Sequence, residues 1–501
     1  MIKIYISFIL AALLTLNATT IDNKPKLAIK TNGQVIYNDV PGEVDTFTAM
    51  FSEGKFYGRL RSNTFYFFWD TPEVNKKNDI HLISGLGGSM VYKSATLDGF
   101  DFVAGLYYSY ALFDAKNDPA FGLKAGKDAV SRFDYVNTGD KSMAVLGQAY
   151  LRYRGITQTE IIAGRQLVET FYTKSNDTKM IPNTFDGLVL ATKVIPQTAI
   201  KLGYLYEQKL RDHTQSHSVL MYGDANSTDA VSPQWSENDD SAMHRGLTYT
   251  RLSAAGVSTH APLIVGDLHN KSIKNLKIDA SFYAVPDIVS QIMGEVNYKF
   301  NVANNISITP GFRYISQFDN GGGEIGGASI FGQLADKEGA SHGYKDASSL
   351  DSQMIGARLV SKIDNYAINL GYTHIFDEAD LVTPWRGFPT SGYTRSMARY
   401  NWFANTKSYR IQMTRNANKT GVYKDMFIEL SLLYTDGDEN KYVTIGDVNL
   451  KYADQIYYYA GFVQNLPILP ELQWRLRLGY NDTDLEGWNN LDTRFELNYL
   501  F

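Results

Sequence analysis

The chain has 501 residues, no cysteine, and 53 acidic against 48 basic residues, which gives a net charge of −5 at pH 7. The lack of cysteine excludes a disulfide framework and a thiolate site. A mean hydropathy of −0.25 excludes a helical membrane protein, because such a protein needs several apolar runs of about 18 residues. Abundant Tyr (34) and Phe (26) with little Pro (14) are instead typical of a transmembrane β-barrel, in which only every second residue meets lipid.

The first residues have the pattern of an export signal. Lys3 gives a short positive flank, residues 4–16 form an apolar run, and residues 17–20 are small or polar. We therefore predict a signal peptide over residues 1–18 and a periplasmic N-terminal segment over residues 19–55. A buried N-terminal helix is the alternative interpretation of the same run.

Segments in which apolar and polar residues alternate follow one another to the end of the chain. In residues 472–480, for example, Trp474 and Leu476 alternate with Arg475 and Arg477. The same pattern occurs in residues 149–154, 276–284, 288–300, 306–314 and 426–434. Strict alternation predicts strands with one apolar and one polar face. A soluble β-sandwich also alternates, so two further features are needed to favour a barrel.

The first feature is the rhythm of the connections. Tight links at residues 301–305, 364–365 and 467–470 take turns with long polar stretches. The long stretches are residues 114–140, 211–245, 317–349 and 376–405. Short periplasmic turns and long outer loops alternate in this way in outer-membrane barrels. We predict an all-β fold, a transmembrane antiparallel barrel of roughly eighteen strands over residues 56–501.

The second feature is the aromatic pattern. Phe495, Leu497, Tyr499 and Phe501 share one face of the last segment, and the chain ends on that face. A terminal aromatic residue that closes an amphipathic strand resembles the insertion signal of bacterial outer-membrane proteins. Other tyrosines fall near predicted strand ends, where amphipathic rings meet lipid headgroups: Tyr92, Tyr153, Tyr206, Tyr298, Tyr434 and Tyr480.

The alternation also predicts which charged side chains face inward, because a Lys or Arg on the lipid face costs about 2–4 kcal/mol at the membrane midplane. The predicted inward basic residues are Arg59, Arg61, Arg152, Arg154, Lys201, Lys277, Lys299, Arg313, Arg358, Arg410, Arg475, Arg477 and Arg494. The predicted inward acids are fewer: Asp279, Glu295, Glu429 and Glu496. We expect a basic pore wall with most acids displaced into loops. The alternative is that these arginines pair with loop acids and hold the loops in place.

Residues 164–166, 176–180 and 182–187 carry a recognisable motif, and residues 45–61 have a matching start of the first strand. They resemble the OprD-like porins, including epsilonproteobacterial major outer-membrane proteins. The resemblance implies an eighteen-stranded barrel, often a homotrimer, whose third long loop folds inward to narrow the pore. Here that loop is residues 166–183, with Glu169, Tyr172, Asp177 and Lys179 as constriction residues. Lys179 stands where Arg is common, which keeps the charge but loses the planar fork. Family members pass small, often carboxylate-bearing solutes along a ladder of basic side chains.

Other chemistry is sparse, so we expect no enzymatic activity, no cofactor and no metal site. His213 and His217 have the spacing of helical metal ligands, but they fall in a polar stretch without matching ligands. We expect an outer-membrane porin that allows passive diffusion of small hydrophilic solutes and favours anionic ones. Its partners would be outer-membrane lipid and solutes, not nucleic acid. Alternatives are a surface-structural or adhesin-type barrel and an outer-membrane enzyme. A receptor barrel would need a folded plug domain, for which the N-terminal segment is short.

Overall fold

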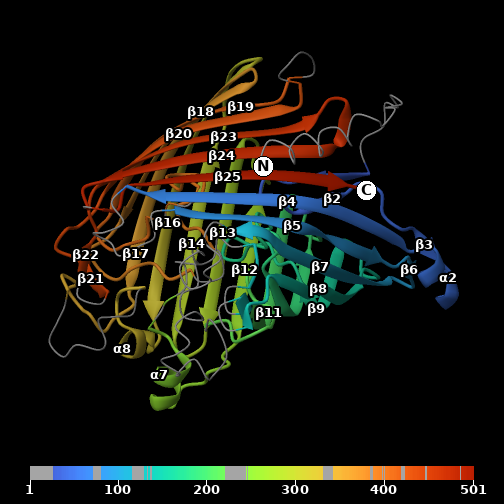
Figure 1. Ribbon diagram of the computed structural model, residues 1–501, viewed down its shortest axis with the longest axis horizontal. Helices are drawn as coiled ribbons and strands as arrows, with labels where there is room; N and C mark the ends of the chain where they lie inside the picture. Colours follow the sequence, from blue (N-terminus) through green and yellow to red (C-terminus); the bar gives the residue numbers. More distant parts are fainter. Residues whose placement is uncertain are drawn as a thin grey trace.

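In the computed structural model, one closed antiparallel barrel of 18 strands accounts for most of the chain (Figure 1). The structure describes residues 26–70, 80–114, 129–131, 134–135, 138–220, 244, 246–330, 342–383, 387–397, 399, 401–418, 424–445, 448–485 and 487–501. In this part of the chain, no helix is long and apolar enough to cross a membrane. The predicted fold class and strand number are confirmed.

The wall follows chain order, so each barrel strand pairs with the next one along the sequence. The barrel strands are β4 (Lys55–Trp69), β5 (Ile80–Lys93), β7 (Phe100–Asp114), β8 (Ser142–Tyr153), β9 (Thr159–Gln166), β10 (Thr184–Thr192), β11 (Thr198–Lys209), β12 (Leu263–Asn270), β13 (Leu276–Val285), β14 (Val289–Tyr298), β16 (Ile306–Asp319), β17 (Ser352–Ile363), β18 (Tyr366–Ile375), β19 (Lys407–Arg415), β20 (Met426–Asp436), β23 (Gln455–Leu466), β24 (Leu469–Thr483) and β25 (Asn490–Leu500). Smaller elements are β1 (Leu27–Ile29), β2 (Val35–Tyr37), β3 (Glu43–Val44), β6 (Thr96–Leu97), β15 (Phe300–Ala303), β21 (Tyr442–Ile445), β22 (Val448–Lys451), α2 (Phe47–Ser52), α7 (Tyr249–Ala254) and α8 (Gly322–Gly326).

The last strand closes the ring against the first, and the terminal aromatic residue takes part. β25 pairs with β4 from Asn490 opposite Trp69 to Leu500 opposite Arg59. The backbone N–H of Gly58 then donates to the carbonyl oxygen of Phe501 at 2.7 Å. A Cβ on residue 58 would lie 2.1 Å from the Phe501 ring, so only glycine leaves room for it. The C-terminal pattern therefore forms the seam of the barrel.

The two faces of the wall have opposite chemistry. Large apolar side chains are exposed on the outer face, such as Ile292, Phe312 and Leu370. On the same strands, Glu295 and Arg313 point inward and are buried, at 6% and 5% exposure. An apolar exterior around a polar interior is the arrangement that lipid requires, because lipid cannot solvate charge. Of the charged residues that the alternation assigned to the inward face, Arg59, Arg61, Arg313, Arg410, Arg477, Asp279, Glu295 and Glu496 are buried on their strands, whereas Arg154 and Lys299 lie just beyond the ends of β8 and β14.

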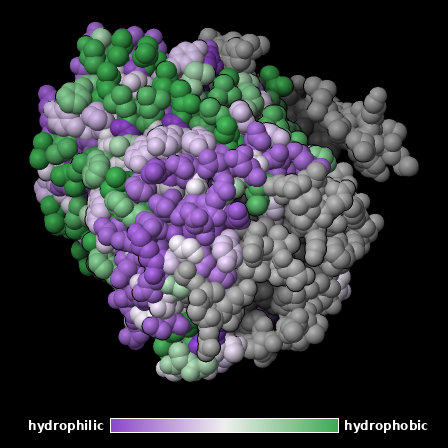
Figure 2. Space-filling view, turned by 90° about the vertical axis from the view of Figure 1, so that its left-hand side faces the viewer, coloured by the Kyte–Doolittle hydropathy of each residue, from purple (hydrophilic) through white to green (hydrophobic). Residues whose placement is uncertain are grey.

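The two ends of the barrel also differ. At one end the links are tight: Asp364 adopts φ +51° in the turn between β17 and β18, a conformation that aspartate tolerates. At the other end long segments join the strands, for example residues 376–406 between β18 and β19. We call these the turn end and the loop end. Figure 2 looks onto the loop end, where hydrophilic residues gather over the middle of the described surface and hydrophobic ones lie along its edge.

The predicted rhythm of long outer connections fails at two places, residues 484–489 between β24 and β25 and a shorter link between β13 and β14. Residues 286–288, between β13 and β14, form a short link at the loop end. A neighbouring long segment covers this link, because the Tyr283 hydroxyl donates to the carbonyl oxygen of Val382 at 2.5 Å. Ile288 and Leu350 are buried in the same cluster. Two long segments thus shield this short connection, which a count of connection lengths cannot show.

Candidate functional site

The segment between β9 and β10, residues 167–183, is held by inward-facing side chains of the wall. The backbone N–H of Phe171 donates to both carboxylate oxygens of Asp267 on β12, at 2.9 and 3.1 Å. The ring of Tyr172 lies edge-on to that of Tyr283 on β13, with centroids 4.8 Å apart. Lys201 Nζ on β11 donates to the Glu169 carbonyl oxygen at 2.9 Å. The first half of the segment is therefore fixed to β11, β12 and β13.

The second half of the segment is fixed to β4. Asp177 Oδ2 accepts from Arg59 Nη1 at 2.8 Å, and its Oδ1 accepts from Arg61 Nη1 at 2.6 Å. Asn63 Nδ2 donates to the carbonyl oxygens of Thr178 and Lys179, both at 3.2 Å. β5 and β7–β12 separate β4 from β13 one way, and β14–β25 the other. The segment therefore crosses the interior between nearly opposite sides of the ring.

The other residues expected at the constriction, Glu169 and Lys179, lie in the same segment. Glu169 accepts from the backbone N–H of Ser175 at 2.9 Å and lies 3.9 Å from Lys174 Nζ, so it closes a turn of the loop. Lys179 is buried at 3% exposure. Glu169, Tyr172, Asp177 and Lys179 thus lie along one inward segment, with Tyr172 packed on β13 and Asp177 bound to β4.

A second inward segment lies between β18 and β19, and no sequence pattern predicted it. The carbonyl oxygens of Pro389 and Ser391 accept from Arg313 Nη1 at 2.5 and 2.9 Å. Further along, Thr394 bonds to Thr373 at 2.7 Å and Ser396 to Ser431 at 3.0 Å. These partners lie on the inner face of β16, β18 and β20. The segment, described at residues 387–397 and 399, therefore lies along the inner face of β16, β18 and β20.

The two inward segments meet at Tyr172. A Cβ on Gly387 would lie 2.9 Å from the Tyr172 carbonyl oxygen, and Phe388 shares a buried cluster with the Tyr172 ring. The Arg313 guanidinium lies over both Phe171 of the first segment and Tyr393 of the second, at 4.9 and 4.3 Å from the ring centroids. Arg313 therefore joins the two segments through cation–π contacts. Loop residues have no regular alternation of inward and outward side chains, so the sequence could not predict that the second segment turns inward. Only its packing in the folded structure shows this.

Arg313 and Arg358 share one acid on the wall. Both guanidinium groups pair with Glu295 on β14, with Arg358 Nη2 at 2.9 Å from Glu295 Oε1. Arg358 also lies over the Tyr393 ring at 4.7 Å. A carboxylate that accepts from two buried arginines is well compensated. The wall itself therefore neutralises one of the two positive charges of these rungs.

Arg152 and Arg154 lie near the turn end of β8. Each is 2.9 Å from a carboxylate oxygen of Asp101 on β7, and Arg152 is also 3.3 Å from Glu160 on β9. Part of each guanidinium stays exposed, with side-chain exposure of 19% for Arg152 and 40% for Arg154. This pair remains accessible from the lumen.

The arginines of β19 and β24 have fewer acidic partners. Arg477 pairs with Glu496 on β25. Arg410 donates to the Arg395 carbonyl oxygen and to Gln412 Oε1, at 3.0 Å for the latter. Neither Arg410 nor Arg475 forms an ion pair with any residue that the structure describes, and Arg475 is partly exposed. Glu429 on β20 faces the same strip and accepts from Gln412 Nε2 at 2.5 Å, so one inward acid offsets part of the positive charge of Arg410 and Arg475.

The interior holds more acids than the sequence analysis assigned to it. Asp101, Asp267 and Asp492 also face inward on their strands and are buried at 1%, 6% and 2% exposure. The expectation that acids are displaced into loops is therefore wrong for these three. The signal was present: Asp101 stands between Phe100 and Phe102, and the alternation that sends those rings outward sends the carboxylate inward.

The N-terminal segment, residues 19–55, is expected in the periplasm from the sequence. The described part of this segment is in direct contact with the barrel. The β1–β2 hairpin lies at the turn end, where Leu27 is buried with the inward-facing Tyr57 and Leu500. The Gly33 carbonyl oxygen accepts from Arg59 Nη1 at 3.0 Å. This part of the segment thus packs on the inner face of the wall.

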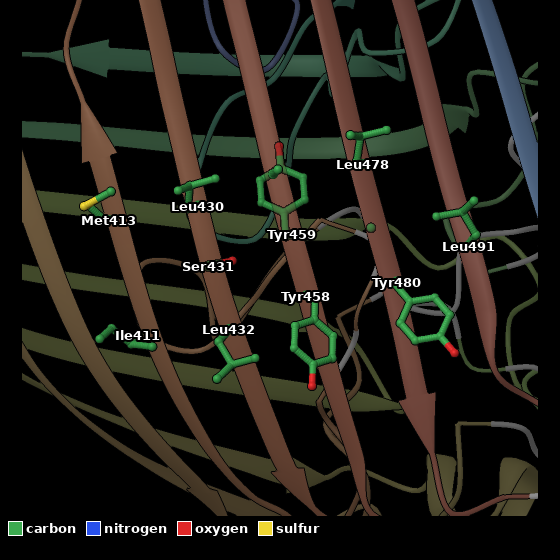
Figure 3. Close-up of a pocket in the computed structure, with 12 residues that line it drawn as sticks. Ile411, Met413, Leu430, Ser431, Leu432, Tyr458, Tyr459, Leu478, Tyr480 and Leu491 are labelled. Carbon is green, nitrogen blue, oxygen red and sulfur yellow. The ribbon is translucent and has the colours of Figure 1, made fainter.

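One groove, of about 450 Å³, lies on the outer face instead, across β19–β25 (Figure 3). Ala460 is the small residue at its centre, with Leu430 and Leu478 on the neighbouring strands. Tyr458 and Tyr480 lie side by side, and their hydroxyls point the same way. The groove faces the lipid side, so it does not belong to a path for polar solutes. Among the described residues no group of acids and histidines has the geometry of a metal site.

No family model and no curated protein sequence matches the chain. Solved structures match over nearly the whole barrel. OpdK of Pseudomonas aeruginosa, solved with vanillate, has a TM-score of 0.61 at 12% identity, covering 89% of this chain and 98% of its own. A BenF-like porin of Pseudomonas fluorescens has a TM-score of 0.64 at 14% identity, with 90% and 99% covered. OccAB3 of Acinetobacter baumannii has a TM-score of 0.65 at 14% identity, with 89% and 99% covered.

The closed ring and its inward segments define a porin-type barrel. The structural neighbours are more specific, because they cover almost the full length of both chains. The chain has the OprD-like porin fold, and the resemblance found in residues 164–187 is confirmed at the level of the fold.

Proposed function

We propose that this protein is an outer-membrane porin through which small hydrophilic solutes diffuse passively. The observation that supports this most directly is the separation of the two faces: exposed apolar side chains outside and charged side chains inside the same strands. A polar interior crossed by two inward segments is suited to a narrow aqueous path. A solved neighbour was crystallised with vanillate, a small carboxylate.

We further propose that the path favours anionic solutes, with the basic ladder as its cause. The arginines of the ladder differ in how much of the side chain is exposed and can contact a solute. Arg59 and Arg61 are buried against Asp177, whereas Arg154 and Arg475 are partly exposed. Partly exposed arginines can exchange hydrogen bonds with a passing carboxylate, which lowers the barrier to its passage. Arg152, Arg154 and Arg475 are therefore the residues that we expect to contact solute, whereas Arg410 is buried at 6% exposure.

The test is a planar-bilayer recording under a KCl gradient. The wild-type reversal potential should show anion preference. Arg152→Ser combined with Arg154→Ser leaves Asp101 and Glu160 without their partners, so the preference should shift clearly toward cations. A strongly cation-selective wild type, or a double variant with unchanged selectivity, would mean that these arginines serve only the structure. An absence of any conductance in folded wild type would reject the porin function itself.

A homotrimer remains a prediction of the resemblance. Light scattering of the detergent-solubilised protein, with the detergent mass subtracted, distinguishes one barrel from three. A single-barrel mass under mild detergent conditions would contradict the prediction.

A further inference from the structure

The N-terminal hairpin is folded by local bonds at its turn. β1 and β2 pair antiparallel, with Leu27 opposite Tyr37 and Ile29 opposite Val35. The Gly33 N–H donates to the Lys30 carbonyl oxygen at 2.9 Å, and the Gln34 N–H donates to Asn32 Oδ1 at 3.2 Å. An isolated two-stranded hairpin is only marginally stable in water. Its position therefore depends on what it contacts.

The base of the hairpin is packed against inward-facing side chains at the turn end. The Tyr37 ring lies edge-on to Tyr57 of β4, with centroids 4.7 Å apart, and Lys93 Nζ of β5 lies 3.8 Å from its centroid. Leu27 is buried with Tyr57 and Leu500. Apolar burial, a ring pair and a cation–π contact together fix the base to β4, β5 and β25.

The tip of the hairpin reaches the first inward segment. A Cβ on Gly33 would lie 1.7 Å from the carbonyl oxygen of Asp177, so the two backbones are in direct contact. Gly33 also has φ +84°, which favours glycine. Arg59 Nη1 donates both to the Gly33 carbonyl oxygen at 3.0 Å and to Asp177 Oδ2 at 2.8 Å. One buried guanidinium thus joins the hairpin, the inward segment and the wall.

A second bond supports the same junction. Asn32 Nδ2 lies 3.4 Å from Glu169 Oε2, on the other limb of the inward segment. The hairpin therefore touches residues 167–183 at two separate points. Because its base is at the turn end and its tip at Arg59, the hairpin occupies lumen directly beneath that segment.

We propose that the β1–β2 hairpin is a second constriction element of the channel, inserted from the turn end and latched to the inward segment through Gly33, Asp177 and Arg59. This inference rests on the proposed porin function. A solute that has passed the inward segment on the β4 side must then pass the hairpin. The N-terminal segment thereby sets the conductance of the open path together with the loop.

The decisive experiment compares the single-channel conductance of the wild type with that of a variant lacking residues 27–37. Deletion should raise conductance severalfold, provided that heat-modifiable migration on a gel shows a folded barrel. A folded deletion variant with wild-type conductance would overturn the proposal. A wild type that does not conduct would instead reject the porin function, so the two failures are distinguishable.

Glycine substitutions give a matched comparison at single residues. Gly33→Ala places a Cβ against Asp177 and should raise conductance, by less than the deletion, as the tip is displaced. Gly256 also has positive φ (+70°) but has open space around it, and Gly42 has open space without positive φ. Gly256→Ala and Gly42→Ala should leave conductance unchanged. Equal conductance in all three variants and the wild type would contradict contact at the tip.

A labelling experiment keeps the test open should the deletion variant fail to fold. The chain contains no cysteine, so a single introduced cysteine is the only thiol. A bulky charged methanethiosulfonate reagent on Asn32→Cys should lower conductance, whereas the same label on exposed Gly42→Cys should not. A mass shift checks that the labelling of Asn32→Cys is complete. Unchanged conductance of the fully labelled protein would overturn the proposal.

Discussion

Two arginine pairs with the same sequence pattern, Arg59 with Arg61 and Arg475 with Arg477, have different surroundings. Both pairs face inward, and only β25 separates their strands, β4 and β24. Arg59 and Arg61 are almost fully buried and both bind Asp177. Arg477 binds Glu496, while Arg475 is partly exposed and forms no ion pair with a described residue. The wall decides that a side chain faces the lumen, but the inward segment decides whether its charge is available to solute.

Deleting residues 172–179 should have the largest effect, because it removes the partner of Arg59 and Arg61 and the contact with Tyr283 together. We expect a severalfold rise in single-channel conductance and a more accessible Arg61, while Arg59 stays bonded to Gly33 of the hairpin. Single-channel recording in KCl checks this, with folding verified by heat-modifiable migration. Unchanged conductance in a folded variant would place the constriction elsewhere, for example at residues 387–399.

Asp177→Asn should destabilise the barrel strongly, because it leaves two buried guanidinium groups without their counter-charge. Breaking a buried pair in this way costs about 3–5 kcal/mol. The matched control is Asp39→Asn, which removes a solvent-exposed ion pair with Lys55 and should leave stability nearly unchanged. Urea unfolding in lipid vesicles measures both. Equal losses for the two variants would remove the distinction between the latch and an ordinary surface pair.

Substitutions on β24 sharpen the comparison through selectivity. Arg475→Ser removes a charge without orphaning an acid, so anion preference should fall while stability stays near that of the wild type. Arg477→Ser removes a charge and leaves Glu496 unpaired, so it should shift preference further and also destabilise the barrel. Reversal potentials and unfolding curves separate the two effects. Identical behaviour of both variants would show that pairing does not decide availability.

The smallest expected effect concerns Asp380, a buried loop acid that, unlike Asp177, is held by neutral donors. Its carboxylate accepts from the Tyr344 hydroxyl and the Ala404 N–H, both at 2.8 Å, and from the Ile330 N–H at 3.1 Å. Burial raises the pKa of Asp380 from its ordinary value of 3.8 to about 6. A raised folded-state pKa adds stability as the pH falls through 6 toward 3.8, and that stability is lost as the pH rises again.

The buried loop histidines His217 and His244 oppose this effect, because burial lowers their pKa values to about 4 and the loops lose stability as the pH falls through 6.5. Between pH 7.5 and pH 5, the outer loops of Asp380→Asn should therefore lose more protease resistance than those of the wild type. Neighbouring Asp377 and Asp438 have lowered pKa values, Asp377 beside Lys441 and Lys345 and Asp438 bonded to Asn405. Their contributions are lost only below their ordinary range, so they do not oppose the effect between pH 7.5 and 5. Limited proteolysis at both pH values makes the measurement. The same pH dependence in Asp380→Asn would assign it to another group.

The sequence predicted the wall well and the lumen incompletely. Strand parity placed Arg313, Arg358 and Glu295 on the inner face, yet it gave no sign that all three meet around one carboxylate. It missed Asp101 although the same rule applies to it. The family motif located the first inward segment, but residues 387–399 and the hairpin carry no comparable pattern. Both segments are irregular or short, so no alternation of apolar and polar residues predicts that they turn into the barrel.

The sequence by itself determined the barrel, its number of strands, the aromatic residue that ends its last strand, and the face of strand residues away from β-bulges such as the one between β7 and β8. These are local properties, because the side-chain period of two and the cost of charge in lipid act on every strand separately. Only the tertiary structure decided which charges remain available. Asp177 and Arg61 are 116 residues apart in the chain, and Arg313 binds Ser391 across 78. Such contacts depend on how the loops pack inside a closed ring, which no local pattern encodes.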